Sequence, residues 1–126
     1  MEDEGIDLIL KKAMERYGPI SVINTTHSEW FCIGFQNGIL TMTRKTEFEN
    51  TENISERISY AMCDGPITGI TWHGNKDDLL VSNGTGILLL YRSCSENGFV
   101  LPVRIPLPGN DAIVHLSTSP PLPLVR

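Results

Sequence analysis

The sequence predicts an all-β fold of antiparallel four-stranded units, preceded by a short amphipathic helix. Between residues 66 and 91, short runs of apolar and polar residues are separated by clusters of turn residues, which is typical of β-hairpins. A similar stretch occurs earlier in the chain, between residues 19 and 45. Residues 6–17, in contrast, repeat apolar side chains at helical spacing, which predicts a helix there.

Residues 1–17 form the predicted N-terminal helix. Its acidic residues come early and its basic residues later, which suits the helix dipole, and Gly18-Pro19 ends it. The helix could pack on its own domain or dock on a partner, and the sequence leaves both possibilities open. The residues predicted to dock are Ile6, Ile9, Ala13 and Met14.

The first four-stranded unit is predicted at residues 18–64. Its strands are expected at 19–26, 30–36, 39–45 and 58–63, with an acidic surface loop at 46–56. The strand at 30–36 carries large apolar side chains on both faces. Both of its faces must therefore be covered.

The second unit is predicted at residues 65–110. Its strands are expected at 66–73, 78–82 and 87–91, followed by a loop at 93–98 and an outer strand at 99–107. The outer strand contains prolines, which an edge strand tolerates. Asn83-Gly84 is predicted to make the tight turn of a hairpin, with both residues at positive φ.

A repeat relates the two units. Gly18-Pro19-Ile20-Ser21 recurs as Gly65-Pro66-Ile67-Thr68 at an offset of 47 (65 − 18), and Asn37–Leu40 matches Thr85–Leu88 at 48 (85 − 37). Asp111–Ser117 resembles Gly65–Thr71 at 46 (111 − 65), so residues 111–126 are predicted to hold the first strand of a third unit and a proline-rich tail. Periods of about 40–50 residues with several strands per period are typical of β-propeller blades.

The second unit also resembles a WD repeat, through Ile70-Thr71-Trp72-His73, Leu79-Leu80-Val81-Ser82 and Ile87–Tyr91. The repeat is degenerate, since Tyr91-Arg92 stands where the family usually has Trp-Asp, and Asp64-Gly65 where it has Gly-His. The resemblance implies a partial β-propeller of WD-repeat type.

Composition excludes several classes of protein. A net charge of −5 and a pI near 5.1 argue against a nucleic-acid surface, and no apolar run approaches the length of a membrane span. The acidic start lacks the pattern of a signal peptide, and Cys32, Cys63 and Cys94 are too widely spaced for a disulfide framework. We therefore expect a cytoplasmic or nuclear protein with buried free thiols.

The sequence does not indicate catalysis or a cofactor. His27, His73 and His115 fall in or near comparable strands, but their positions differ and no ligand spacing accompanies them, so no metal site is expected. Nucleophile motifs and phosphate-binding loops before helices are also missing from the sequence, so no enzyme is expected.

The predicted function follows from the number of blades in the chain. A propeller needs about four blades to close, and this chain supplies two and the start of a third. We therefore expect a non-enzymatic interaction subunit, a scaffold in a multi-subunit assembly, whose open faces are covered by other protein subunits or by a second copy of the chain. Besides the helix, the predicted docking residues are Ile113 and His115. Alternatives are a small closed β-sandwich or barrel that binds a ligand, and a hydrolase on a propeller-like scaffold.

Overall fold

The computed structural model describes residues 2–45, 56–60, 62, 65–75, 77–100 and 102–105, with side chains from residue 6 onward. The described residues form two helices and eight strands. In chain order these are α1 (Glu2–Tyr17), β1 (Ile20–Asn24), β2 (Trp30–Phe35), β3 (Leu40–Arg44), β4 (Glu56–Ser59), β5 (Ile67–His73), β6 (Asp78–Asn83), β7 (Leu88–Tyr91), α2 (Cys94–Asn97) and β8 (Val103–Ile105).

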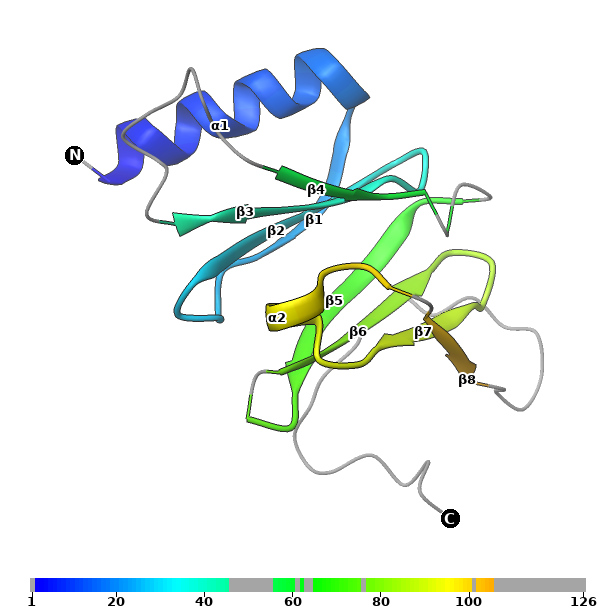
Figure 1. The fold of residues 1–126 in the computed structure, drawn as a ribbon. Helices are drawn as coiled ribbons and strands as arrows, with labels where there is room; N and C mark the ends of the chain where they lie inside the picture. The colour runs from blue at the N-terminus through cyan, green and yellow to red at the C-terminus, as the bar shows by residue number, and fades with distance from the viewer. Residues whose placement is uncertain are drawn as a thin grey trace.

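The strands make two antiparallel sheets, each with its strands in chain order. We call β1-β2-β3-β4 the N-terminal sheet and β5-β6-β7-β8 the C-terminal sheet. The two sheets face each other, and α1 lies across the N-terminal sheet on the side opposite to the C-terminal sheet (Figure 1). The prediction of an all-β fold made of four-stranded antiparallel units is confirmed.

The helix α1 ends where the sequence predicts. Gly18 takes a φ of 95°, which an L side chain rarely adopts, and its N–H donates to the Met14 carbonyl over 2.9 Å. The apolar stripe of α1 packs on β2, which places a second cluster of buried side chains on this side of the sheet. That cluster is Ile9, Ala13, Phe31, Ile33 and Phe35.

The hairpins β2–β3 and β6–β7 use the same loop, which differs from the predicted one. The residues at positive φ are Gly38 (89°) and Gly86 (91°), the third residue of each loop between the strands, and not Asn83 and Gly84. This is the hairpin in which a left-handed glycine follows a tight turn. Asn83 acts through its side chain instead, because its Oδ1 accepts hydrogen bonds from the Thr85 and Ile87 N–H groups over 3.1 and 3.0 Å.

The outer strands are shorter than predicted. The strand expected at 58–63 is β4 (56–59), and the strand expected at 99–107 is β8 (103–105). Pro102 and Pro106 flank β8 in the sequence, and neither has a backbone N–H to extend the ladder. Within the loop expected at 93–98, residues 94–97 form the helix α2, whose Cys94 is buried between the sheets.

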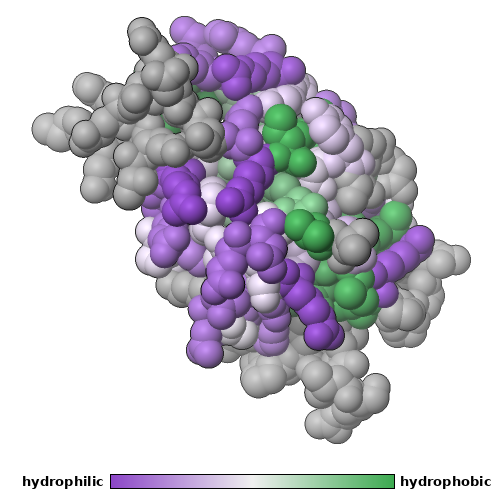
Figure 2. All heavy atoms as spheres, viewed as in Figure 1, coloured by the Kyte–Doolittle hydropathy of each residue, from purple (hydrophilic) through white to green (hydrophobic). Residues whose placement is uncertain are grey.

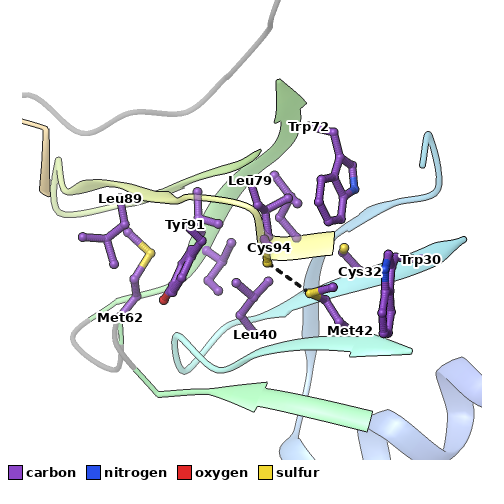
Figure 3. Packing of buried hydrophobic residues seen from close by; sticks show 13 residues of the cluster. Trp30, Cys32, Leu40, Met42, Met62, Trp72, Leu79, Leu89, Tyr91 and Cys94 are labelled. Carbon is purple, nitrogen blue, oxygen red and sulfur yellow. Dashed lines mark hydrogen bonds between the residues drawn. The ribbon is translucent and has the colours of Figure 1, made fainter. Parts of the chain in front are cut away.

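The largest core lies between the two sheets. Both faces contribute aliphatic, aromatic and sulfur-containing side chains, so the space between the sheets is filled by packed atoms (Figure 3). The buried members are Trp30, Cys32, Leu40, Met42, Met62, Ile67, Ile70, Trp72, Leu79, Val81, Leu89, Tyr91 and Cys94.

Candidate interaction surface

The two sheets repeat one plan in detail. β1 pairs with β2 through Ile20↔Phe35 and Val22↔Gly34, and β5 pairs with β6 through Ile67↔Asn83 and Gly69↔Ser82. A bulge interrupts β1 and β5 at the same place, between the first and third residues of each strand. A residue of β1 therefore has its equivalent in β5 47 positions later, and residues of β2 and β3 have theirs in β6 and β7 48 positions later.

The structure shows how one sheet covers the next. Ile67, at the start of β5, sits over Gly34, where a Cβ atom would lie only 2.7 Å from Ile67 Cγ2. Polar side chains of β1 hold the same strand, since Ser21 Oγ donates to the Ile67 carbonyl over 2.6 Å and Asn24 Nδ2 donates to the Ile70 carbonyl over 2.8 Å. The first strand of the C-terminal sheet is thus attached to the face of the N-terminal sheet that contains Gly34.

The other side of the interface is closed by α2. Trp30 donates from Nε1 to the Ser95 carbonyl over 3.1 Å. Arg44 and Arg57 lie over its ring, with guanidinium carbons 4.6 and 4.9 Å from the centroid. The Cys94 thiol approaches Met42 Sδ at 3.3 Å (Figure 3). These contacts fix the two sheets to each other at both margins.

The opposite face of the N-terminal sheet is covered by α1, which decides the position of the predicted docking residues on the helix. Ile9 and Ala13 are buried against the sheet, and Ile6 packs on the same cluster. Met14 is 46% exposed and remains available for a contact. Ile113 and His115 lie outside the described residues.

Burial of Ile9 and Ala13 answers the question that the sequence left open about α1. Its apolar stripe packs on its own sheet, and Tyr17 and Arg16 both contact Glu56 of β4. Burial, followed by the nearby Glu56 carboxylate, raises the pKa of Tyr17 to about 12. The helix therefore belongs to the fold of this chain.

The C-terminal sheet has a second face, directed away from the N-terminal sheet, which we call the end face. Alternation along the strands places on it the residues that do not contribute to the inter-sheet core. Across the sheet from β5 to β8 these form two rows: Thr71, Leu80, Leu90 and Val103, and beside them Gly69, Ser82, Leu88 and Ile105.

Exposure changes across the end face. On its β5–β6 half, Leu80 is 2% exposed and Ser82 0%, whereas Val103 on β8 is 46% exposed. Neither of the two hydrophobic clusters formed by the described residues contains Leu80 or Leu88. Beyond β7, Val100 is also more than half exposed. In the view of Figure 2, hydrophobic residues gather in a band across the middle of the molecule, with hydrophilic residues on both sides.

The end-face residues were absent from the sequence-based list of docking residues. The repeat in the sequence could have identified them. At an offset of 48 residues, the positions equivalent to Gly34, Leu40 and Met42 are Ser82, Leu88 and Leu90. The first three residues face the other sheet in the structure. Their equivalents occupy the matching face of the C-terminal sheet.

The described residues carry little that resembles a chemical centre. His27 is buried, accepts the Glu29 N–H at Nδ1 over 2.9 Å and packs against Trp72, with ring centroids 4.4 Å apart and the ring planes tilted by 49°. No group of three or more histidine, cysteine, aspartate or glutamate side chains that could hold a metal ion occurs in the part of the chain that the structure describes. Burial raises the pKa of the Cys32 thiol, and it raises that of Cys94 to about 12, so both thiols stay protonated at neutral pH.

Comparison of the chain with protein-family models, with curated proteins and with solved structures finds no match. Among the described residues, neither helix has the length and apolar character needed to cross a membrane. Function is therefore inferred from the geometry of the two sheets.

Proposed function

We propose that this chain is a non-enzymatic interaction subunit, an incomplete propeller of WD-repeat type whose end face is covered by a β-sheet of a partner protein. In this proposal the N-terminal and C-terminal sheets are successive blades. The chain acts as a scaffold that contributes these blades to a larger assembly.

The main support for the proposal is a difference between the two outer faces of the sheet pair, the face of the N-terminal sheet under α1 and the end face of the C-terminal sheet. At one end α1 covers the N-terminal sheet and buries Phe31, Ile33 and Phe35. At the other end, Leu80 of β6 and Leu88 of β7 are 2% exposed, whereas Val103 of β8 is 46% exposed. One end is thus closed by a helix, and the other offers apolar surface to a partner.

The packing of the two sheets in this chain indicates what kind of surface the partner would present. The face of the N-terminal sheet that is equivalent to the end face is covered by a four-stranded antiparallel sheet. A partner that presents a similar sheet, with aliphatic side chains between those of the end face, would bury the exposed residues in the same way. The proline-flanked β8, with only three residues, offers little edge for strand addition, which favours packing on the face.

The two other hypotheses find less support in the described residues. A ligand-binding sandwich or barrel needs space between its sheets, and here that space is filled by the side chains of the inter-sheet core. For a hydrolase, the buried histidine and the protonated thiols offer no activated nucleophile.

The test compares three charged variants of equally exposed side chains. Val103→Glu changes the end face, Leu8→Glu changes the solvent side of α1, and Met14→Glu tests the remaining docking residue of the helix; these side chains are 46%, 40% and 46% exposed. Each tagged variant is purified from the native cell, and bound proteins are quantified by mass spectrometry. Solution mass distinguishes a partner protein from a second copy.

We expect Val103→Glu to reduce the bound partner at least about tenfold, since burying an unpaired carboxylate costs more than 1.4 kcal/mol. Leu8→Glu and Met14→Glu should retain it. Retention of every partner by Val103→Glu, or a parent chain that is a compact monomer with no affinity for hydrophobic dyes, would refute the proposal.

A further inference from the structure

The inter-sheet core contains three sulfur-bearing side chains that lie together, Cys32, Met42 and Cys94, which we call the sulfur cluster. Cys32 of β2 pairs directly with Met42 of β3, so both side chains leave the same face of the N-terminal sheet. Cys94 begins α2 on the other side of the interface, and its thiol lies 3.3 Å from Met42 Sδ. In Figure 3 the three side chains point toward one another. All three are 0% exposed, so the cluster is shielded from water.

Two buried hydrogen-bond donors beside the cluster have no acceptor among the described residues. They are Trp72 Nε1 and Arg57 Nη1. Burial and then Cys94 raise the pKa of the Cys32 thiol, and the Trp72 side chain opposes them. Burial likewise raises the pKa of the Cys94 thiol to about 12, and the charge of Arg57 opposes it. Each cysteine thus has an unsatisfied donor near it, and a buried donor without an acceptor destabilises a protein.

We propose that the sulfur cluster is a binding site for one copper(I) ion, held by the thiolates of Cys32 and Cys94 and the thioether of Met42. Thiolate and thioether sulfurs are soft ligands, which select Cu(I). Metal–thiolate bonds are about 2.3 Å long, so two sulfurs that share one ion at angles of about 90–120° lie roughly 3.3–4.0 Å apart. Cys94 and Met42 already lie at the short end of this range.

The two unsatisfied donors suit the charge of the bound complex. One Cu(I) ion and two thiolates carry one net negative charge (+1 − 2), and a buried charge needs a partner. The guanidinium of Arg57 supplies the opposite charge, and Trp72 Nε1 can donate to the Cys32 thiolate. The two thiol protons leave to solvent as the ion binds, so the step needs no oxidant or reductant. Zn(II) with the same ligands would be neutral and would lack its usual fourth ligand.

The proposed ligands come from both sides of the interface between the sheets. A bound ion would therefore link β2 and β3 to α2 and hold the two sheets together. Sequence spacing does not indicate this site, because the ligands lie 10 and 52 residues apart (42 − 32 and 94 − 42) in three separate elements. The inference is independent of the proposed function, since it requires no partner protein and does not involve the end face.

Anaerobic titration of the purified, reduced full chain with Cu(I) tests the site. The ion is supplied as its bicinchoninate complex, whose colour is lost when the protein takes the ion, and native mass spectrometry counts the ions bound. We expect one Cu(I) ion per chain and at least about a hundredfold weaker binding of Zn(II). Failure of the chain to take Cu(I), or tighter binding of Zn(II), would overturn the proposal.

Substitutions of sulfur residues locate the ion. Cys94→Ala should weaken Cu(I) binding at least about a hundredfold and Met42→Leu at least about tenfold. Met62→Leu is the matched control, because Met62 is buried in the same core but lies apart from the cluster (Figure 3). Cys63→Ser, which changes a thiol outside the described residues, is a second control. Both controls should bind Cu(I) as the parent does. Loss of binding in Cys63→Ser, or unchanged binding in Met42→Leu and Cys94→Ala, would contradict the assignment of ligands.

The role of Arg57 has its own test. Arg57→Met should weaken Cu(I) binding at least about tenfold at an unchanged ratio of one ion per chain, and Arg57→Lys should restore most of the affinity, because it keeps the positive charge. A purely structural role would not be restored by charge alone. Equal affinity in both variants and the parent would overturn the proposed charge balance.

Two measurements on the unmodified chain keep the proposal testable if the variants do not fold. X-ray absorption of the copper-loaded chain should show sulfur ligands only, and nitrogen or oxygen ligands would overturn the proposal. Cu(I) should also raise the melting temperature, because an ion that binds the folded chain stabilises it. A lower melting temperature would mean that the ion prefers the unfolded chain.

Discussion

Gly34→Ala is expected to destabilise the protein, because Gly34 lies where the two sheets touch. A Cβ atom at this position would lie 2.7 Å from Ile67 Cγ2 and 2.9 Å from Val22 Cγ1. Carbon atoms prefer a separation of about 3.5–4.0 Å. Both neighbours are β-branched and stiff about χ1, so they cannot rotate away without strain. To admit the methyl group, β5 must move away from the N-terminal sheet and the Val22 side chain on β1 must shift.

Two opposing effects set the magnitude. Alanine restricts the unfolded chain more than glycine does, which alone stabilises a strand by about 0.5–1 kcal/mol. Overpacking of a well-filled core costs about 1–3 kcal/mol. The second effect is larger here, because neither neighbour can move freely. With a urea m-value of about 1–3 kcal/mol/M, the unfolding midpoint should fall by roughly 0.5–1 M.

The measurement is urea unfolding followed by tryptophan fluorescence, since Trp30 and Trp72 are both buried. Ile67→Gly provides the control background, because it removes both Ile67 atoms that meet the new methyl group, Cγ2 at 2.7 Å and Cβ at 2.8 Å. Gly34→Ala should cost at least about 1 kcal/mol less in that background. A midpoint that rises, or the same cost in both backgrounds, would show that Gly34 is not a point of contact between the sheets.

Three further predictions concern single side chains. Trp72→Ala should cost about 3–5 kcal/mol in the same unfolding assay, because the side chain is 5% exposed in the inter-sheet core; a loss below about 1 kcal/mol would contradict its burial. Gly98→Ala should destabilise more than Gly74→Ala: both glycines have positive φ, but a Cβ at Gly98 lies 2.9 Å from Arg57 Nη1, whereas at Gly74 the nearest atom is 3.6 Å away. Equal losses would exclude that clash. Burial raises the pKa of Tyr17 from 10.0 to about 12, so the unfolded state loses this proton first and stability falls as the pH rises from 10 to 12. Tyr17→Phe should show a smaller fall than the parent in pH-dependent melts, and an equal fall would mean that Tyr17 titrates normally.

The local structure and its repetition were predictable from the sequence. Alternating side chains and turn residues predict the inner strands, and β1 and β5 begin at the matching residues Ile20 and Ile67. The helix stop at Gly18 was also predictable, because glycine adopts a positive φ at little cost. These features depend on residues close together in the chain, so short-range patterns are sufficient to find them.

Packing between segments far apart in the sequence could be seen only in the tertiary structure. α1 is amphipathic whether it packs on its own sheet or on a partner, and only the contacts of Ile9 and Ala13 with Phe31 and Phe35 distinguish the two. The outer strands depend on partners across the sheet as well as on their own residues, so their lengths were overestimated. The end face was not recognised from alternation, because Leu80 and Val81 are equally apolar, and their opposite directions follow from which one meets the neighbouring sheet.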